Sequence, residues 1–280
     1  MQKLKTKKFK KLEIKTKKIL SWDFFGNYKT LFKGLWIDFA EIREYFYWDS
    51  IKRIDWKTSA KQNKLFVKNY EQERDLKILF FLDIWKNMNF WSEKISKIDL
   101  EIQIFYILAL SAIKSQDNVW VILFNWEKDF FIDYSKSEEI IIKTLNKIKN
   151  FSKIKKSQKK QNYLDILKKY KLKDNLIFIL TDNLEFDKKI FRSIDLYNEI
   201  IYINIFDYFE NNLSSKKFIF PFSWKKWFID FSFWKNRENY INFRKEKLDN
   251  FKRNLWKNNI KYMYFDTKSD LFKNLMKIWI

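Results

Sequence analysis

Short apolar runs alternate with longer amphipathic stretches from Lys77 to the end of the chain. The runs have the length of buried strands and the stretches the length of helices, an order typical of a mostly parallel sheet with helices on both faces. The predicted strands are Lys77–Ile84, Val119–Phe124 with a hairpin partner near Asp129–Asp133, Leu176–Leu180, Ile200–Ile205 and Ile260–Phe265, and a further hairpin is predicted over Lys217–Phe233. The predicted helices are Ser92–Lys114, Ser137–Phe151, Tyr163–Tyr170, Asp187–Leu196, Arg237–Leu255 and Ser269–Ile278. The fold class is therefore α/β, preceded by a small β-rich block.

The first of these apolar runs ends at a carboxylate, Asp83. A buried strand that stops at an acid presents that acid at its C-terminal end, which is where open α/β sheets bind ligands. We expect Ser92 to be the N-cap of the helix that follows, and Asp117-Asn118 to end it. Asp83 is thus the first candidate site residue.

The block before this strand, 37–75, is dense in charged and aromatic residues. Its pattern predicts short strands around a turn near Trp48–Ser50, a helical turn over Ile54–Lys61 and a strand over Lys64–Tyr70. The domains we expect are a basic N-terminal arm (1–20), a segment that contains this block (21–75) and an α/β domain (76–280). Hydrophobic periodicity alone leaves open whether the charges of the block pair with one another or face a partner.

Three spaced motifs lie in order between residues 39 and 88: R-E-Y-x-x-x-D-x-x-x-R-I-D-W-K-x-x-A, L-x-V-K-x-Y-E-x-E-R-D and L-D-x-x-x-x-M. This series resembles the DUF58 family, bacterial proteins similar to von Willebrand factor A (vWA) domains and usually encoded beside MoxR-type AAA+ ATPases. The segment from Asp207 to Leu213 is similar to the family's D-P-x-E-x-x-L loop, with Tyr208 in place of proline. The candidate interaction and signature residues are Arg43, Glu44, Tyr45, Asp49, Arg53, Asp55, Trp56, Lys68, Glu71, Glu73 and Arg74.

The resemblance implies a fold in which Mg²⁺ binds at the strand tips through a D-x-S-x-S motif, a threonine from a second loop and an aspartate from a third. Hydroxyl, carboxylate and water oxygens suit this hard ion. Here Asp83 matches the aspartate, but Trp85 and Asn87 replace the two serines. Lys86 also places a positive charge beside the pocket, which opposes a divalent cation.

The other two ligand positions are only partly filled. No threonine matches near residues 161–164, where Asn162 is the nearest oxygen donor, while Asp182 corresponds to the third-loop aspartate. The candidate metal ligands are therefore Asp83, Asn87 and Asp182, and they make a degenerate site for Mg²⁺ at best.

The absence of both cysteine and histidine removes thiol chemistry and the commonest general base and metal ligand. Asp83 and Asp182 are paired carboxylates of the kind that can act as a catalytic acid and base. No nucleophile motif or phosphate-binding glycine loop accompanies them, so we do not expect an enzyme.

The formal net charge of +22 raises the possibility of nucleic acid as a partner. The excess consists mainly of lysine spread along the whole chain, together with much Ile, Asn and Phe, as an AT-rich bacterial genome yields. A solvated surface is therefore the favoured interpretation. The chain lacks any apolar run long enough to span a membrane and has a Lys-rich start without an apolar stretch, so we expect a cytoplasmic protein.

Three functions follow as hypotheses. The first, implied by the resemblance, is a non-enzymatic vWA-like adaptor that acts with a MoxR-type AAA+ ATPase and an unknown protein client. The second is a protein that binds nucleic acid or an anionic surface through its lysines. The third is a Mg²⁺-dependent ligand-binding vWA domain.

Thirteen tryptophans and two glycines are an abnormal pair of counts for 280 residues. Several tryptophans stand where the resembled family has glycine, whereas Trp56 stands where the family itself has tryptophan. We therefore hypothesise that the gene uses UGA as a glycine codon. The affected positions would be Trp22, Trp36, Trp48, Trp91, Trp120, Trp126, Trp224, Trp227, Trp234 and Trp256.

The coding sequence tests this hypothesis directly. We expect UGA at Trp48 and UGG at Trp56, because only the first is predicted to stand for glycine. UGG at both positions would refute the recoding.

Overall fold

The computed structural model describes residues 41–46, 54–62, 64–69, 76–90, 95–125, 129–151, 163–170, 172–211, 219–222, 227–230 and 234–276. The chain divides into two compact units, one within Leu20–Asp75 and the other containing Leu76–Ile280. The boundary falls where the charged block gives way to the first apolar run. The predicted basic arm, the turn near Trp48–Ser50 and the start of the helix predicted at Ser92 lie outside the described residues.

The smaller unit contains a two-stranded antiparallel sheet, β1 (Glu41–Glu44) with β2 (Phe66–Asn69), and helix α3 (Trp56–Gln62). The buried Ser59 of α3 accepts a hydrogen bond of 2.9 Å from the backbone N–H of Phe66, which ties the helix to β2. The helical turn and the second strand predicted for this block are confirmed, each with slightly different ends.

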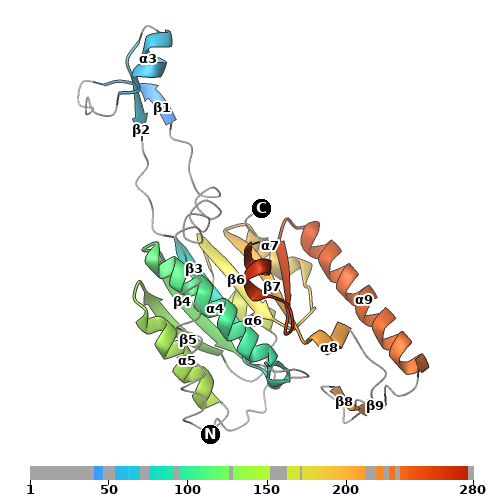
Figure 1. Cartoon of the computed structure of the whole chain (residues 1–280). Helices are drawn as coiled ribbons and strands as arrows, with labels where there is room; N and C mark the ends of the chain where they lie inside the picture. The colour runs from blue at the N-terminus through green and yellow to red at the C-terminus, as the bar shows by residue number, and fades with distance from the viewer. Residues whose placement is uncertain are drawn as a thin grey trace. The chain divides into compact units, whose positions relative to one another are not determined.

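A six-stranded sheet forms the centre of the larger unit, in the order β10-β7-β6-β3-β4-β5. Five of the strands run parallel, and the edge strand β5 is antiparallel to β4. This confirms the predicted α/β class, and Figure 1 shows the sheet with its helices. The strands are β3 (Lys77–Asp83), β4 (Asn118–Phe124), β5 (Asp129–Ser135), β6 (Asn175–Thr181), β7 (Asn198–Phe206) and β10 (Lys261–Asp266).

Helices cover both faces of this sheet. Successive side chains along the central strands point to opposite faces, and both sets are apolar. On one face, helix α4 (Lys97–Lys114) packs beside α5 (Glu139–Phe151) (Figure 1). Phe105 of α4 there meets Phe80 edge-on at 5.1 Å between ring centroids. The other face packs against α6 (Tyr163–Lys169), α7 (Lys188–Asp195) and α9 (Trp234–Trp256) in one continuous apolar core.

The remaining elements are short. They are the 3-10 turn η2 (Lys86–Asn89), helices α8 (Tyr208–Asn211) and α10 (Leu271–Met276), and the antiparallel pair β8 (Ile219–Phe222) and β9 (Trp227–Asp230). The pair β8–β9 confirms the hairpin predicted for 217–233. Within the described ranges no helix combines the length and the apolar character needed to cross a membrane.

The start of helix α4 differs from the prediction. The helix begins at Lys97 with Ser96 as its N-cap, and Ser96 and Asp99 form a reciprocal capping box. Ser92 was wrong: both serines precede apolar residues at helical spacing, so hydrophobic periodicity does not decide between them. Ser96 has an acid at the third helical position, which is the stronger signal.

The backbone bears on the tryptophan hypothesis at the described positions. Within the described ranges the non-glycine residues with positive φ are Gln116, Asp174 and Asn259, and none of the described tryptophans is among them. Trp120 is instead packed in the core, with its ring stacked on Tyr134 at 5.0 Å between centroids. A left-handed backbone therefore does not explain a glycine at Trp120, Trp227, Trp234 or Trp256, and the recoding remains a prediction for the codons to test.

The capping box supplies a test of the corrected helix start. S96A should lower the free energy of unfolding by about 1 kcal/mol, because the Asp99 N–H loses its side-chain acceptor. Urea denaturation measures this change. S193A is the matched control: Ser193 is exposed near the end of α7, and its loss should change stability by less than about 0.5 kcal/mol. Equal effects of the two substitutions would contradict the assignment of Ser96.

Candidate functional site

The carboxyl ends of β3 and β6 lie side by side in the middle of the sheet. The chain passes outward from β3 through β4 to β5, then returns to the other side of β3 to form β6. The boundary between β3 and β6 is thus the switch point at which open α/β sheets bind ligands. Because Leu82 pairs with Leu180, Asp83 at the end of β3 adjoins Thr181 at the end of β6.

Asp83 is held by hydrogen bonds to both of its carboxylate oxygens. The hydroxyl of Thr181 donates to Oδ2 at 2.7 Å, and the backbone N–H of Trp85 donates to Oδ1 at 2.9 Å. Its predicted place at the C-terminal end of the first strand is confirmed. However, the residue is only 2% exposed, so its carboxylate belongs to the interior at the end of the sheet and not to the exposed surface.

A second carboxyl group, Glu101 of helix α4, lies against the first. Its Oε1 accepts a hydrogen bond of 2.8 Å from the backbone N–H of Asp83. The side chain is fully buried, and Oε2 has no hydrogen-bond partner among the described residues. Two acidic side chains therefore meet in the interior, with one oxygen left unsatisfied.

Lys97 brings a buried positive charge to the same end of the sheet. Its ammonium donates to Asp182 Oδ2 at 2.6 Å and to Glu210 Oε1 at 2.8 Å. The Lys97 side chain is 3% exposed, and its partners belong to the segments that follow β6 and β7. A single ammonium thus connects helix α4 to the ends of two strands.

Glu210 also receives a second cation. Its Oε2 accepts a hydrogen bond of 2.6 Å from the Arg244 guanidinium of helix α9, which lies over the Phe206 ring. Glu210 is the glutamate of the D-P-x-E-like segment, and it lies in helix α8 just after β7. Both of its oxygens are therefore occupied by charge-assisted hydrogen bonds, the stronger kind.

Burial dominates the acidity of the carboxyl pair. Burial, reinforced by the negative charge of Asp182, raises the pKa of Asp83 to about 7 against the opposing hydrogen bond from Thr181. Burial and the neighbouring Asp83 carboxylate raise the pKa of Glu101 well above its ordinary value. In both cases the interior disfavours the charged form more than nearby donors favour it.

The ion pairs behave in the opposite way. Burial by itself would lower the pKa of the Lys97 ammonium, but the carboxylates of Asp182 and Glu210 outweigh it and raise that pKa. Burial likewise acts to raise the pKa of Glu210, and the charges of Lys97 and Arg244 reverse this and lower it. Lys97 and Glu210 are therefore both charged at neutral pH.

The residues at the strand ends do not fit the Mg²⁺ that the vWA resemblance implies. The structure brings together Asp83 and Asp182, two of the three predicted ligands, but the Lys97 ammonium already contacts Asp182. Asn87 lies in η2, next to Trp85, and neither supplies the hydroxyl that the motif has at these positions. An ammonium at this distance opposes a divalent cation and takes one of its oxygen ligands.

Two further details of the predicted metal site change. Asn162, the candidate for the second-loop position, lies outside the described residues. The threonine that contacts Asp83 is instead Thr181, beside Asp182. The cation that matters is Lys97, whereas Lys86, which the sequence singled out, is exposed on η2.

Among the described signature residues of the smaller unit, Asp55 and Glu44 have contacts with other residues of the same unit. Asp55 caps helix α3 through the Lys57 N–H at 3.2 Å, and exposed Glu44 pairs with Lys64 at 2.6 Å. Arg43 and Tyr45 lie at β1, Lys68 lies in β2, and Trp56 is 65% exposed. Asp49, Arg53, Glu71, Glu73 and Arg74 lie outside the described residues, so the choice between pairing and partner contact remains open.

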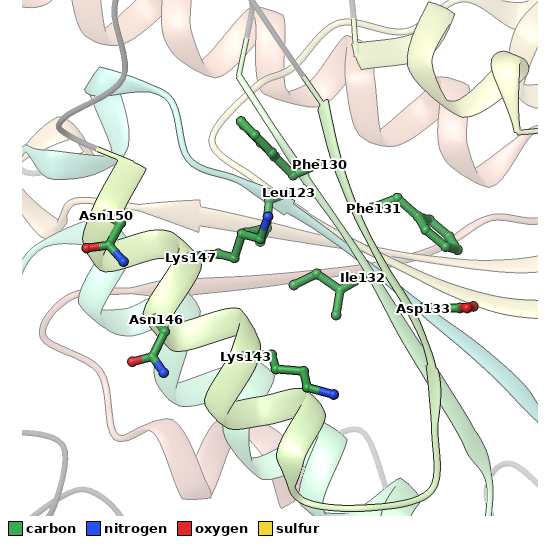
Figure 2. A pocket seen from close by; sticks show the side chains of 9 residues that line it. All are labelled: Leu123, Phe130, Phe131, Ile132, Asp133, Lys143, Asn146, Lys147 and Asn150. Carbon is green, nitrogen blue, oxygen red and sulfur yellow. The ribbon is translucent and has the colours of Figure 1, made fainter.

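A groove of about 680 Å³ lies elsewhere, between edge strand β5 and helix α5. Figure 2 shows the side chains of Phe130 and Ile132 on the face of β5 that is turned toward Lys143 and Lys147 of α5. The Lys147 ammonium is 5.3 Å from the centroid of the Phe130 ring. None of the buried charges at the strand ends lines this groove, so the two features are separate.

Comparison with known proteins identifies the family of this chain. A family model described as "Protein of unknown function DUF58" matches residues 41–217. The chain belongs to the DUF58 family. The match includes most of the signature block of this DUF58 protein and the strand ends with Asp83, Asp182 and Glu210. No curated protein matches the chain.

One solved structure with a similar fold is described as the "conserved hypothetical protein BatB from Bacteroides thetaiotaomicron". It has 10% sequence identity and a TM-score of 0.45, and the alignment covers 72% of this chain and 95% of that one. A likeness at this level is too low to support a conclusion about function.

Sequence reasoning missed Lys97, Glu101 and Arg244 in this site. Lys97 and Glu101 are about one helical turn apart, a spacing that puts an ammonium and a carboxyl group on one face of an otherwise apolar helix. That was the available signal. Arg244 had none, since α9 carries many exposed charges.

The pKa of Asp83 predicts a pH effect of known sign. The folded value of about 7 lies above the unfolded value of about 3.9, so the folded chain binds more protons between them. This carboxyl therefore contributes a loss of stability as the pH rises from about 4 to about 7, and no further change above. Urea unfolding at a series of pH values measures the profile.

D83N removes this titration, so its profile should fall less steeply than that of the wild type over the same range. Glu210 keeps its two cations in both proteins, whereas Glu101 loses the neighbouring carboxylate that raises its pKa, so the difference between the profiles reports the coupled Asp83–Glu101 pair. D249N, which changes an exposed carboxylate of α9, should keep the wild-type profile. Parallel profiles for wild type and D83N would show that Asp83 does not carry the effect.

Proposed function

We propose that this DUF58 protein is a non-enzymatic vWA-like adaptor that works with a MoxR-type AAA+ ATPase in assembling or remodelling protein complexes. Membership of the family supports the domain type. The ATPase as partner comes from the gene arrangement usual among proteins that the sequence resembles. The structure contributes the argument against a reactive centre.

The observation that carries the proposal is that the charged groups at the strand ends bind other groups of the protein itself. Asp83 bonds Thr181, and Asp182 and Glu210 bond Lys97. A general acid or base must reach a proton of its substrate, either directly or through one water. Carboxylates that are buried and already paired within the protein suit a structural role better than a catalytic one.

The same contacts determine which surface is available to a partner. They fix the starts of the segments after β3, β6 and β7, and these segments carry exposed groups such as Lys86 and Asn89 of η2 and Glu185 after β6. Loops held by a rigid scaffold are the usual place for binding residues. We therefore assign the partner surface to the strand-end loops around η2.

The exposed lysines do not favour nucleic acid as the ligand. In the described parts of the larger unit they occur on α5 over one face of the sheet and on α6 and α7 over the other. Binding to a phosphate backbone calls for a basic patch or stripe on one side. A lysine excess shared between opposite faces fits a solvated surface.

Matched charge reversals test the proposed surface. K86E should weaken binding to the neighbouring ATPase about tenfold, since it reverses a charge at the strand-end loops. K77E makes the same change at the start of β3, the end of the strand away from η2, and should alter the Kd by less than about twofold. Kd values from biolayer interferometry with the purified full-length chain and the ATPase measure both.

K147E adds a control at the groove between β5 and α5. Loss of binding in K147E but not K86E would move the partner surface to that groove. Equal weakening by all three variants would indicate an unspecific effect of net charge. Failure of the wild type to bind the ATPase, or the lack of such a gene nearby, would contradict the partnership itself.

A further inference from the structure

The buried lysine of helix α4, Lys97, connects three segments at the ends of the strands. In the vWA arrangement that the sequence resembles, a divalent cation joins three loops at the strand ends. Here Lys97, in the helix that follows β3, donates to Asp182 after β6 and to Glu210 after β7. We propose that the Lys97 ammonium takes the place of the divalent cation, so that the strand-end site is closed by an internal charge and needs no metal.

The contacts of Lys97 are those of a permanent part of the site. Its distances of 2.6 Å and 2.8 Å to two carboxylates are typical of short charge-assisted hydrogen bonds. The side chain is 3% exposed, so the ammonium has exchanged most of its hydration for these two partners. A buried cation of this kind persists only when anions compensate it.

The oxygen ligands of a metal are absent or occupied. Mg²⁺ requires near-octahedral oxygen coordination. Trp85 and Asn87 stand at the two serine positions, and Asp83 already accepts hydrogen bonds from Thr181 and from the Trp85 N–H. Asp182, the remaining ligand, is the closest partner of Lys97. The carboxylate oxygens that would coordinate a metal therefore accept hydrogen bonds instead.

The balance of charge leads to the same conclusion. Lys97 and Arg244 compensate Asp182 and Glu210 through three ion pairs. Removal of the Lys97 charge would leave Asp182 without this cation, close to the buried Glu101, whose Oε2 has no partner among the described residues. A variant without Lys97 should therefore gain affinity for the cation that the wild-type protein excludes.

Substitution of Lys97 tests the inference on the full-length chain. K97M keeps a long unbranched side chain, one heavy atom shorter than that of lysine, and removes its charge. We expect its thermal midpoint to fall by about 5–10 °C in EDTA, since a buried ion pair loses one partner. Addition of about 10 mM Mg²⁺ or Mn²⁺ should then raise the K97M midpoint by about 3 °C.

Three controls separate a cation site from a general salt effect. K77M removes an exposed lysine and should respond to neither EDTA nor Mg²⁺. K97M/D182N also lacks the carboxylate that the metal would bind in place of Lys97. Its thermal midpoint should not rise in Mg²⁺ or Mn²⁺. K97R keeps the positive charge and should be as indifferent to Mg²⁺ as the wild type.

The wild type and K97R carry the test even if K97M fails to fold. A wild-type midpoint that stays within about 1 °C between EDTA and Mg²⁺ supports the inference. A wild-type rise that disappears in D182N shows that a metal binds despite Lys97 and overturns it. A folded K97M with no rise in Mg²⁺ or Mn²⁺ also overturns it, because the ammonium would then not stand in a cation position. These outcomes are independent of any ATPase partner.

Discussion

The pairing of the Lys97 ammonium with Asp182 and Glu210 is the interaction on which the strand-end region depends. A parallel sheet collects the carboxyl ends of its strands at one edge, and here those ends deliver acidic residues into the interior. Uncompensated buried carboxylates are costly in free energy. Lys97 and Arg244 neutralise two of them, and the raised pKa values of Asp83 and Glu101 keep the remaining pair from adding two full charges at neutral pH.

This arrangement explains how a vWA-like topology can persist without its usual ligand chemistry. The switch point between β3 and β6 brings the same strands together whatever the residues at their ends. Thr181, Glu210 and Lys97 then connect loops that a metal would otherwise connect. The site becomes an organiser of the loops around it, which suits the adaptor role that we propose.

The hydrophobic pattern was sufficient to predict the fold. Runs such as Lys77–Leu82 and Leu176–Leu180 are buried on both faces, so they appear in the sequence as continuous apolar segments bounded by polar residues. The main error, Ser92 in place of Ser96, came from a boundary where periodicity is uninformative. Helix α4 is buried around much of its circumference, which hides the amphipathic signal that usually marks where a helix starts.

By itself the sequence determined the order of strands and helices, the family signature and the place of Asp83 at the end of its strand. Only the tertiary structure decided which charges meet. Lys97 is 85 residues from Asp182 and 113 from Glu210, and its spacing with Glu101 marks a charged face of helix α4 without showing which distant acids that face meets. Burial selects the pairing, because a charge removed from water must be compensated by whatever opposite charge the fold places beside it.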